Sequence, residues 1–268
     1  MINLLIAASL STGVPVAPDP VDAQPAMFVV RDQDTTIYLF GTFHTLDANP
    51  DWFNGAMRSA FEGSQELVLE TLTPGNGTAP VSATGPQAFV SYSGAPANAS
   101  FLSTTHLAIS AGRSRGMSVD NGADVILRRA AEFEGKNVEG LETFDSQLRM
   151  FTRLPATARP VRAATSTNAA TGSGPTSRLT DAMADMQSAW KRGDQTFFVR
   201  LLDQMRRNSP DTYRMMFTER NARWADWIAA RLRSPGTVFI AIGAGHLAGK
   251  DSVLVRLAEH GIESSRLN

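Results

Sequence analysis

Two histidines occupy the same position in two similar turns, one near each end of the chain. His44 follows Gly41 and His246 follows Gly243, so both turns read Gly-x-x-His. Each turn comes directly after a run of apolar, β-branched and aromatic residues, which predicts a buried strand. An imidazole held at the end of a rigid strand can bind a divalent metal or transfer a proton. We therefore expect these turns to form the functional centre.

Two glutamates end other predicted strands, and their carboxylates are candidates for the same site. Glu70 ends a strand that we expect beside that of the first turn, and Glu142 follows the strand at 137–141. His44, His246 and Glu70 together form a set that binds Zn, Mn, Fe or Co and leaves positions open for water. Without a metal, a histidine and a carboxylate can act as base and orienting group. A strand-terminal glutamate can also simply cap a helix, and a histidine there can be structural.

The elements that must position these residues alternate between strands and helices. Strands are expected at residues 27–31, 35–40, 66–71, 137–141 and 237–242, and helices at 50–63, 120–135, 146–154, 179–192, 194–207, 210–233 and 251–260. This alternation predicts an α/β fold, in which two strand–GxxH–helix half-sites share a central mixed sheet flanked by helices. Both turns then lie at the carboxyl edge of the sheet, where such folds bind ligands. The glycines are expected to allow a sharp bend there.

Composition narrows the possible functions. The chain has 268 residues, 43% of them hydrophobic, and a formal net charge of −1, so it can bury a large core and has no basic field for nucleic acid. The arginines of the second half are spaced as on solvated helix faces. There is no cysteine, which excludes disulfides and thiolate ligands.

The first 25 residues resemble a secretory signal or a disordered N-terminus. Residues 1–10 are apolar, and small residues follow as at a cleavage site, although a basic n-region is missing. We therefore expect an exported protein, periplasmic or secreted. No other segment has the roughly 18 apolar residues that a spanning helix needs, so we expect no stable membrane insertion.

Two stretches and two further histidines carry weaker signals. Residues 73–100 and 159–177 are rich in small residues, Pro and Thr, which predicts long loops. His106 has no partner signal, and we interpret it as a surface or packing residue. His260 ends a helix, where a cation is favourable, and is interpreted as structural.

Several segments, in their order along the chain, resemble the TraB/GumN family, which is related to the Tiki proteases and more distantly to erythromycin esterases and haem-binding ChaN proteins. These segments are YLFGTFH at 38–44, LVLE at 67–70, VEGLET at 138–143, ERN at 219–221 with Trp224 and Ile228 after it, and GAGHL at 243–247. The resemblance covers residue 26 to the C-terminus. It implies one domain over 26–268, with a helical insertion at about 144–233. The segment at 73–103 departs from the pattern, because a clearer helical signal would be expected there.

The resemblance also implies an activity and two further site residues. Tiki-type members are described as metal-dependent peptidases, which would place His44, Glu70 and His246 on a divalent metal such as Mn, Co or Zn. The family's Arg-Asn pair corresponds to Arg220 and Asn221. An arginine suits a substrate carboxylate or a developing oxyanion, and an asparagine can orient a ligand or water.

Three hypotheses follow from the residues and the resemblance together. The first is a metal-dependent hydrolase acting on a peptide or small-molecule substrate. The second is a metal-free, esterase-like hydrolase with a histidine as base beside Glu70 or Glu142. The third is a binding protein for haem or another small ligand, without turnover. The oligomeric state is not predicted.

Overall fold

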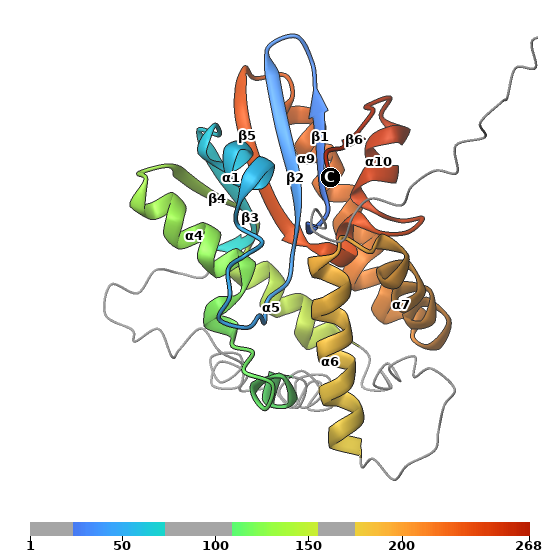
Figure 1. Ribbon diagram of the computed structural model, residues 1–268. Helices are drawn as coiled ribbons and strands as arrows, with labels where there is room; N and C mark the ends of the chain where they lie inside the picture. Colours follow the sequence, from blue (N-terminus) through green and yellow to red (C-terminus); the bar gives the residue numbers. More distant parts are fainter. Residues whose placement is uncertain (1–23, 73–108, 155–174) are drawn as a thin grey trace, which may run out of the picture.

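The computed structural model describes residues 24–72, 109–154 and 175–268, and these form a mixed sheet between two layers of helices (Figure 1). The six strands run in the order β4-β3-β5-β2-β1-β6. Their bounds are β1 Met27–Arg31, β2 Thr35–Thr42, β3 Glu66–Leu72, β4 Asn137–Thr143, β5 Gly236–Gly243 and β6 Ser265–Arg266. The predicted α/β class is confirmed.

The sheet is parallel at its centre and antiparallel at one end. β1 and β2 form an antiparallel hairpin, in which Oδ1 of Asp32 accepts hydrogen bonds from the backbone N–H groups of Asp34 and Thr35. β2, β5, β3 and β4 are parallel neighbours in that order. β5 therefore separates β2 from β3. The expectation that the strand of Glu70 lies beside that of the first turn is wrong, because β3 contacts the strand of the second turn instead.

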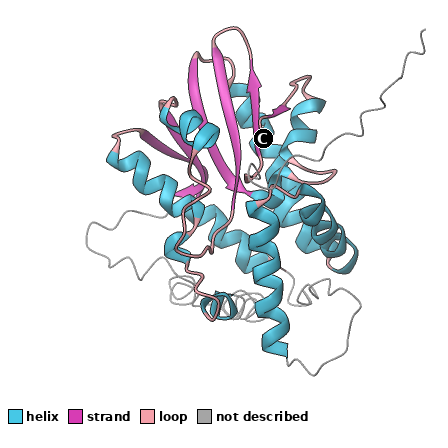
Figure 2. Cartoon of the chain, in the orientation of Figure 1, coloured by secondary structure: helices cyan, strands magenta, loops and turns pink. Residues whose placement is uncertain are grey.

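Helices cover both faces of the sheet (Figure 2). Their bounds are α1 Gly55–Glu62, α4 Ala123–Phe133, α5 Phe144–Arg153, α6 Pro175–Lys191, α7 Gln195–Asn208, α8 Pro210–Tyr213, α9 Glu219–Arg231 and α10 Val253–Glu259. α1, α4, α6 and α7 contribute to the apolar core on one face, and α9 and α10 to the core on the other. β5 alternates between these cores, since Phe239 belongs to the first and Ile240 to the second. Its predicted cover on both faces is confirmed.

Several helices differ from their predicted bounds at the ends, and two of the differences have a clear structural cause. The first begins at Gly55 instead of residue 50, because Asn54 is extended (φ −145°, ψ −179°) and Gly55 has a positive φ of 50°. The predicted helix at 210–233 is interrupted by a π-helical turn, η4 Arg214–Thr218, between α8 and α9. π turns of this kind occur frequently at functional sites.

Some predictions fall outside the described residues. The signal-like residues up to 23, the predicted loop at 73–100, His106 and most of the connector at 159–177 lie there. Export and the domain limits therefore stay predictions. The described part of the predicted insertion at 144–233 holds α5 to α9. No helix in the described part of the chain is long and apolar enough to cross a membrane.

Candidate functional site

The two Gly-x-x-His turns lie side by side. β2 and β5 pair in parallel up to Thr42 and Gly243, so both strands end at the same edge of the sheet. β3 and β4 end at this edge as well, and they carry Glu70 and Glu142 there. The predicted meeting of the two half-sites at the carboxyl edge is confirmed.

Neither glycine of the two turns has a positive φ, and Gly41 serves close packing. Gly243 has φ −52° and ψ 135°, which other residues also adopt, and Gly41 has no positive φ. A Cβ atom on Gly41 would lie 3.1 Å from Cα of Ala244, so the bare glycine lets the two turns approach each other. The chain does leave the strand for a helical turn after Gly243, but this change of direction needs no backbone conformation that is special to glycine.

Gly243 also leaves a space between the candidate side chains. A Cβ atom there would lie 3.5 Å from Oε1 of Glu70, 3.6 Å from Cδ2 of His246 and 3.8 Å from Nε2 of His44. All three side chains therefore border the space that is left free because Gly243 has no side chain.

His44 is held by a carboxylate from α4. Its Nδ1 lies 3.0 Å from Oδ1 of Asp124, in the first turn of that helix. The Asp124 carboxylate raises the pKa of His44 to about 9. The His44 side chain is 56% exposed, so solvent weakens this attraction but also reaches the ring.

The position of Asp124 is fixed by the contact between α4 and the first turn. The N–H group of Ala123 donates to the carbonyl of Phe43 at 3.0 Å. A Cβ atom on Gly122 would lie 2.5 Å from the carbonyl oxygen of His44, so only glycine fits there. Sequence analysis missed Asp124, because an acidic residue in the first turn of a helix is common for reasons unrelated to a site.

His246 is buried and held by Asn221. The Nδ2 group of Asn221 donates to the backbone carbonyl of Asp251 at 2.7 Å, which turns its Oδ1 toward Nδ1 of His246 at 2.5 Å. Nδ1 therefore carries the proton, and Nε2 faces Glu70. The rings of Phe217 and Trp224 pack on the imidazole, with centroids 4.8 and 4.4 Å away. Burial lowers the pKa of His246 although Glu70 opposes this, so the ring is neutral at pH 7.

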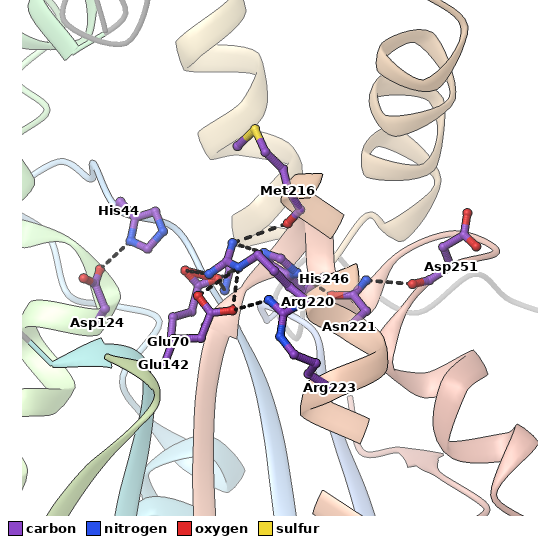
Figure 3. A network of polar contacts seen from close by, with 11 residues as sticks. His44, Glu70, Asp124, Glu142, Met216, Arg220, Asn221, Arg223, His246 and Asp251 are labelled. Carbon is purple, nitrogen blue, oxygen red and sulfur yellow. Dashed lines mark hydrogen bonds and ion pairs between the residues drawn. The ribbon is translucent and has the colours of Figure 1, made fainter. Parts of the chain in front are cut away.

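Arg220 connects the two glutamates with His246 (Figure 3). Its Nε donates to both carboxylate oxygens of Glu142, at 3.0 and 3.1 Å. Its Nη1 lies 3.3 Å from Nε2 of His246, and its Nη2 lies 3.7 Å from Oε2 of Glu70. Burial opposes the ionisation of Glu70, but the Arg220 guanidinium beside it outweighs burial and holds the pKa of Glu70 well below its usual range.

The π turn helps to place this arginine. The carbonyl of Met216, within the turn, accepts a hydrogen bond from Nη1 of Arg220 at 3.4 Å. Phe217 of the same turn packs against Gly245, where a Cβ atom would lie 3.1 Å from its ring. The π turn therefore contacts the site through Met216 and Phe217. No sequence signal indicated this turn.

Comparison with known proteins gives one match. The model of the TraB/PrgY/gumN family matches residues 26–89 and 87–266. The chain belongs to this family. No curated protein and no solved structure matches the chain significantly.

In this TraB-family protein, the predicted site residues occupy one end of the sheet, in two groups. Figure 3 shows His44 with Asp124 in one group, and Glu70, Glu142, Arg220, Asn221 and His246 linked in the other. Arg220 is 3% exposed, so the interpretation of the second-half arginines as solvated is wrong for this residue. His260 lies apart from the site, in an ion pair with Asp226 at 3.1 Å.

The groups around the two imidazoles decide whether this family member could hold a divalent metal. Metal-bound histidines usually have their second ring nitrogen anchored, as Asp124 and Asn221 anchor Nδ1 of the two imidazoles here. In the arrangement described, however, no three His, Cys, Asp or Glu side chains among the described residues form a group that could hold a metal. The Arg220 cation also lies beside both His246 and Glu70, where it competes with a metal.

Proposed function

We propose that the protein is a hydrolase of acyl bonds in which His44 transfers the proton. The observation that carries this proposal is the pairing of His44 with Asp124. Nδ1 is held at 3.0 Å, while Nε2 borders the space above Gly243 and the side chain is reachable from solvent. This is the arrangement of a general base whose tautomer is fixed by a carboxylate.

The chemistry follows from the two ring nitrogens. Neutral His44 accepts a proton from water at Nε2, and the oxygen of that water attacks the acyl carbon. The imidazolium then returns the proton to the leaving group, while Asp124 stabilises its charge at Nδ1. Glu70 and Arg220 stay ionised throughout the reaction. Their charges are already in place when charge develops in the transition state, so the site does not have to rearrange to stabilise it. A peptide or a small-molecule ester is the proposed substrate.

The test uses p-nitrophenyl esters and quenched fluorogenic peptides, with and without a strong chelator. We expect hydrolysis that survives chelation and falls at least about a hundredfold in His44→Ala, because a general base contributes that much. His260→Ala is the matched control, since His260 also pairs with an aspartate but lies outside the site. Equal rates in wild type and His44→Ala would exclude the proposal.

A metal-dependent hydrolase is the second candidate, and the contact between His246 and Glu70 favours it. The Asn221 contact leaves a lone pair on Nε2 of neutral His246, and this nitrogen lies 3.1 Å from Oε1 of Glu70. A nitrogen lone pair and a carboxylate oxygen that face each other are stabilised by a cation, a charge that Arg220 supplies in this structure and that a metal would supply in its place. His44, His246 and Glu70 would hold Mn, Co or Zn, which would supply an acidified water.

Metal titration distinguishes the two candidates. Chelator-treated protein is titrated with Mn, Co or Zn, and both heat of binding and hydrolysis are measured. The second candidate predicts binding that His246→Ala abolishes, and activity that returns with the metal. Absence of binding, together with chelator-resistant hydrolysis, would leave only the first candidate.

A further inference from the structure

A hollow of about 370 Å³ lies at the ends of β3 and β4, next to the candidate site. It is lined by Leu72, Gly140, Glu142, Thr143, Phe144 and Asp145. Its volume falls in the range of small-ligand pockets. The hollow is formed where two strands end and α5 begins, so its walls belong to three elements.

The hollow offers a mainly apolar surface. Leu72 and Phe144 contribute apolar side chains, and Gly140 contributes none. A Cβ atom on Gly140 would lie 3.0 Å from the backbone nitrogen of Leu72, so the strands approach too closely there for a side chain. Thr143 uses its hydroxyl to cap α5, where it accepts a hydrogen bond from the N–H group of Ser146.

The wall holds two carboxylates: that of Asp145 is exposed, and that of Glu142, the buried one, is already neutralised. Glu142 accepts from Arg220, and Nη2 of Arg223 lies 3.3 Å from its Oε1. Its side chain is 6% exposed, so it adds little free charge to the hollow. Uncharged apolar groups are therefore the chemistry that this surface accepts best.

The hollow adjoins the candidate site through one shared residue, Glu142. Glu142 is part of its wall and is bonded to Arg220, which contacts both His246 and Glu70. On the other side, Leu72 follows Glu70 on β3 by two residues, a distance of roughly 7 Å along a strand. If the cleaved bond of a substrate lies beside Glu70, a group only a few atoms away in the same substrate can therefore reach the hollow.

We propose that this hollow is the specificity pocket of the site and binds an uncharged apolar group of the substrate, next to the bond that is cleaved. This rests on the proposed hydrolase function. The group is an apolar acyl chain or side chain, because the walls are apolar and the one buried carboxylate is paired.

A series of p-nitrophenyl esters with acyl chains of two to eight carbons tests the pocket. In wild type, kcat/KM should rise by up to about fourfold for each added methylene until the hollow is full. Leu72→Trp should move the best substrate to shorter chains, and Phe144→Ala should move it to longer ones. Val255→Trp, on α10 at the opposite end of the sheet, is the control and should leave the profile unchanged. A flat wild-type profile, or one that both pocket variants leave unchanged, overturns the pocket while the hydrolase proposal stands.

Binding without turnover separates the two proposals. 1-Hexanol is titrated into protein with labelled leucine methyl groups, and the Leu72 signals are followed by NMR. Saturable shifts at Leu72 that Phe144→Ala weakens support the pocket even if no ester is hydrolysed, in which case only the hydrolase proposal fails. No saturable shift at Leu72 overturns the pocket.

Discussion

At the residue scale, the site depends on which atom holds each imidazole. Asp124 holds His44 from one side, and Asn221 holds His246 from the other, both through Nδ1. The two residues differ in exposure and charge, because Asp124 is a carboxylate near solvent and Asn221 is a buried amide. His44 is therefore favoured as a cation, whereas His246 is favoured as a neutral ring.

The raised pKa of His44 predicts how activity depends on pH. A general base works only when deprotonated, so kcat/KM should rise with pH and level off above about 9. In Asp124→Asn the main attraction is lost, and the midpoint should fall toward 6.5, the ordinary pKa of a histidine, with a lower plateau because the ring is less well oriented. A pH–rate profile of each protein on one ester measures this. The same midpoint in both proteins would contradict the assignment.

The same pair should make stability depend on pH. The folded-state pKa is raised, so the stabilisation from this pair is complete below about pH 6.5 and is lost as pH rises through about 9. Asp124→Asn should remove this pH-dependent difference. Chemical denaturation at pH 6 and pH 10 measures it, and the effect should be small because His44 is more than half exposed. A difference that persists in the variant would assign it to other groups.

Gly243 offers a substitution that fills the site without straining the backbone. Its φ and ψ suit alanine, and the added methyl group would lie at ordinary contact distance from the candidate side chains. Gly243→Ala should therefore fold with an unchanged melting temperature and lose most of its ester hydrolysis. Gly112→Ala is the control, since its Cβ also has contacts no closer than 3.5 Å, but to Met117 and Thr45. Full activity in Gly243→Ala would show that the space above this glycine is not used.

At the element scale, α6 holds the first turn through one side chain. Nε1 of Trp190 donates to the carbonyl of Gly41 at 2.7 Å, and the indole is 1% exposed. Trp190→Phe should lower the free energy of unfolding by about 1–3 kcal/mol, because the hydrogen bond is lost and a cavity remains.

Trp52 provides the matched control for this prediction. It contacts Trp190, is 3% exposed, and its Nε1 has no hydrogen-bond partner within the described residues. Trp52→Phe should cost less than Trp190→Phe, since it removes packing but no hydrogen bond. Urea unfolding of both variants measures the difference, and a larger loss in Trp52→Phe would refute the role of the Gly41 contact.

The sequence predicted the strands and helices better than it predicted how they are arranged in space. The strand patterns near both turns gave the strands, and the shared Gly-x-x-His spacing gave the meeting of the turns at one edge. The order of the strands was not predictable, since nothing local shows that β5 enters between β2 and β3. For the same reason Asp124 was missed, because its role depends on how α4 packs against the turn.

At the scale of the whole molecule, the C-terminal residues fasten the start of the described fold. Leu267 donates its N–H to the carbonyl of Met27, and the side chain of Asn268 bonds both Met27 and Pro25. Deleting residues 265–268 should lower the melting temperature by roughly 5–10 °C, through the loss of a few hydrogen bonds and of β6. Adding Gly-Ser after Asn268 is the control and should change little. An unchanged melting temperature after the deletion would show that this contact does not stabilise the fold.

The position of β5 also sets an order of events during synthesis. The strand that fills the centre of the sheet is made after β1 to β4, so β2 and β3 have no native neighbour between them until about residue 243 has left the ribosome. Pairs so distant in the chain form slowly, because a long loop must close before any contact stabilises it. During that time one edge of each apolar strand has unpaired backbone N–H and C=O groups, and such edges can pair with the wrong strand. We therefore expect folding to depend on a chaperone that covers these strand edges. The two histidines can come together only when β5 pairs between β2 and β3.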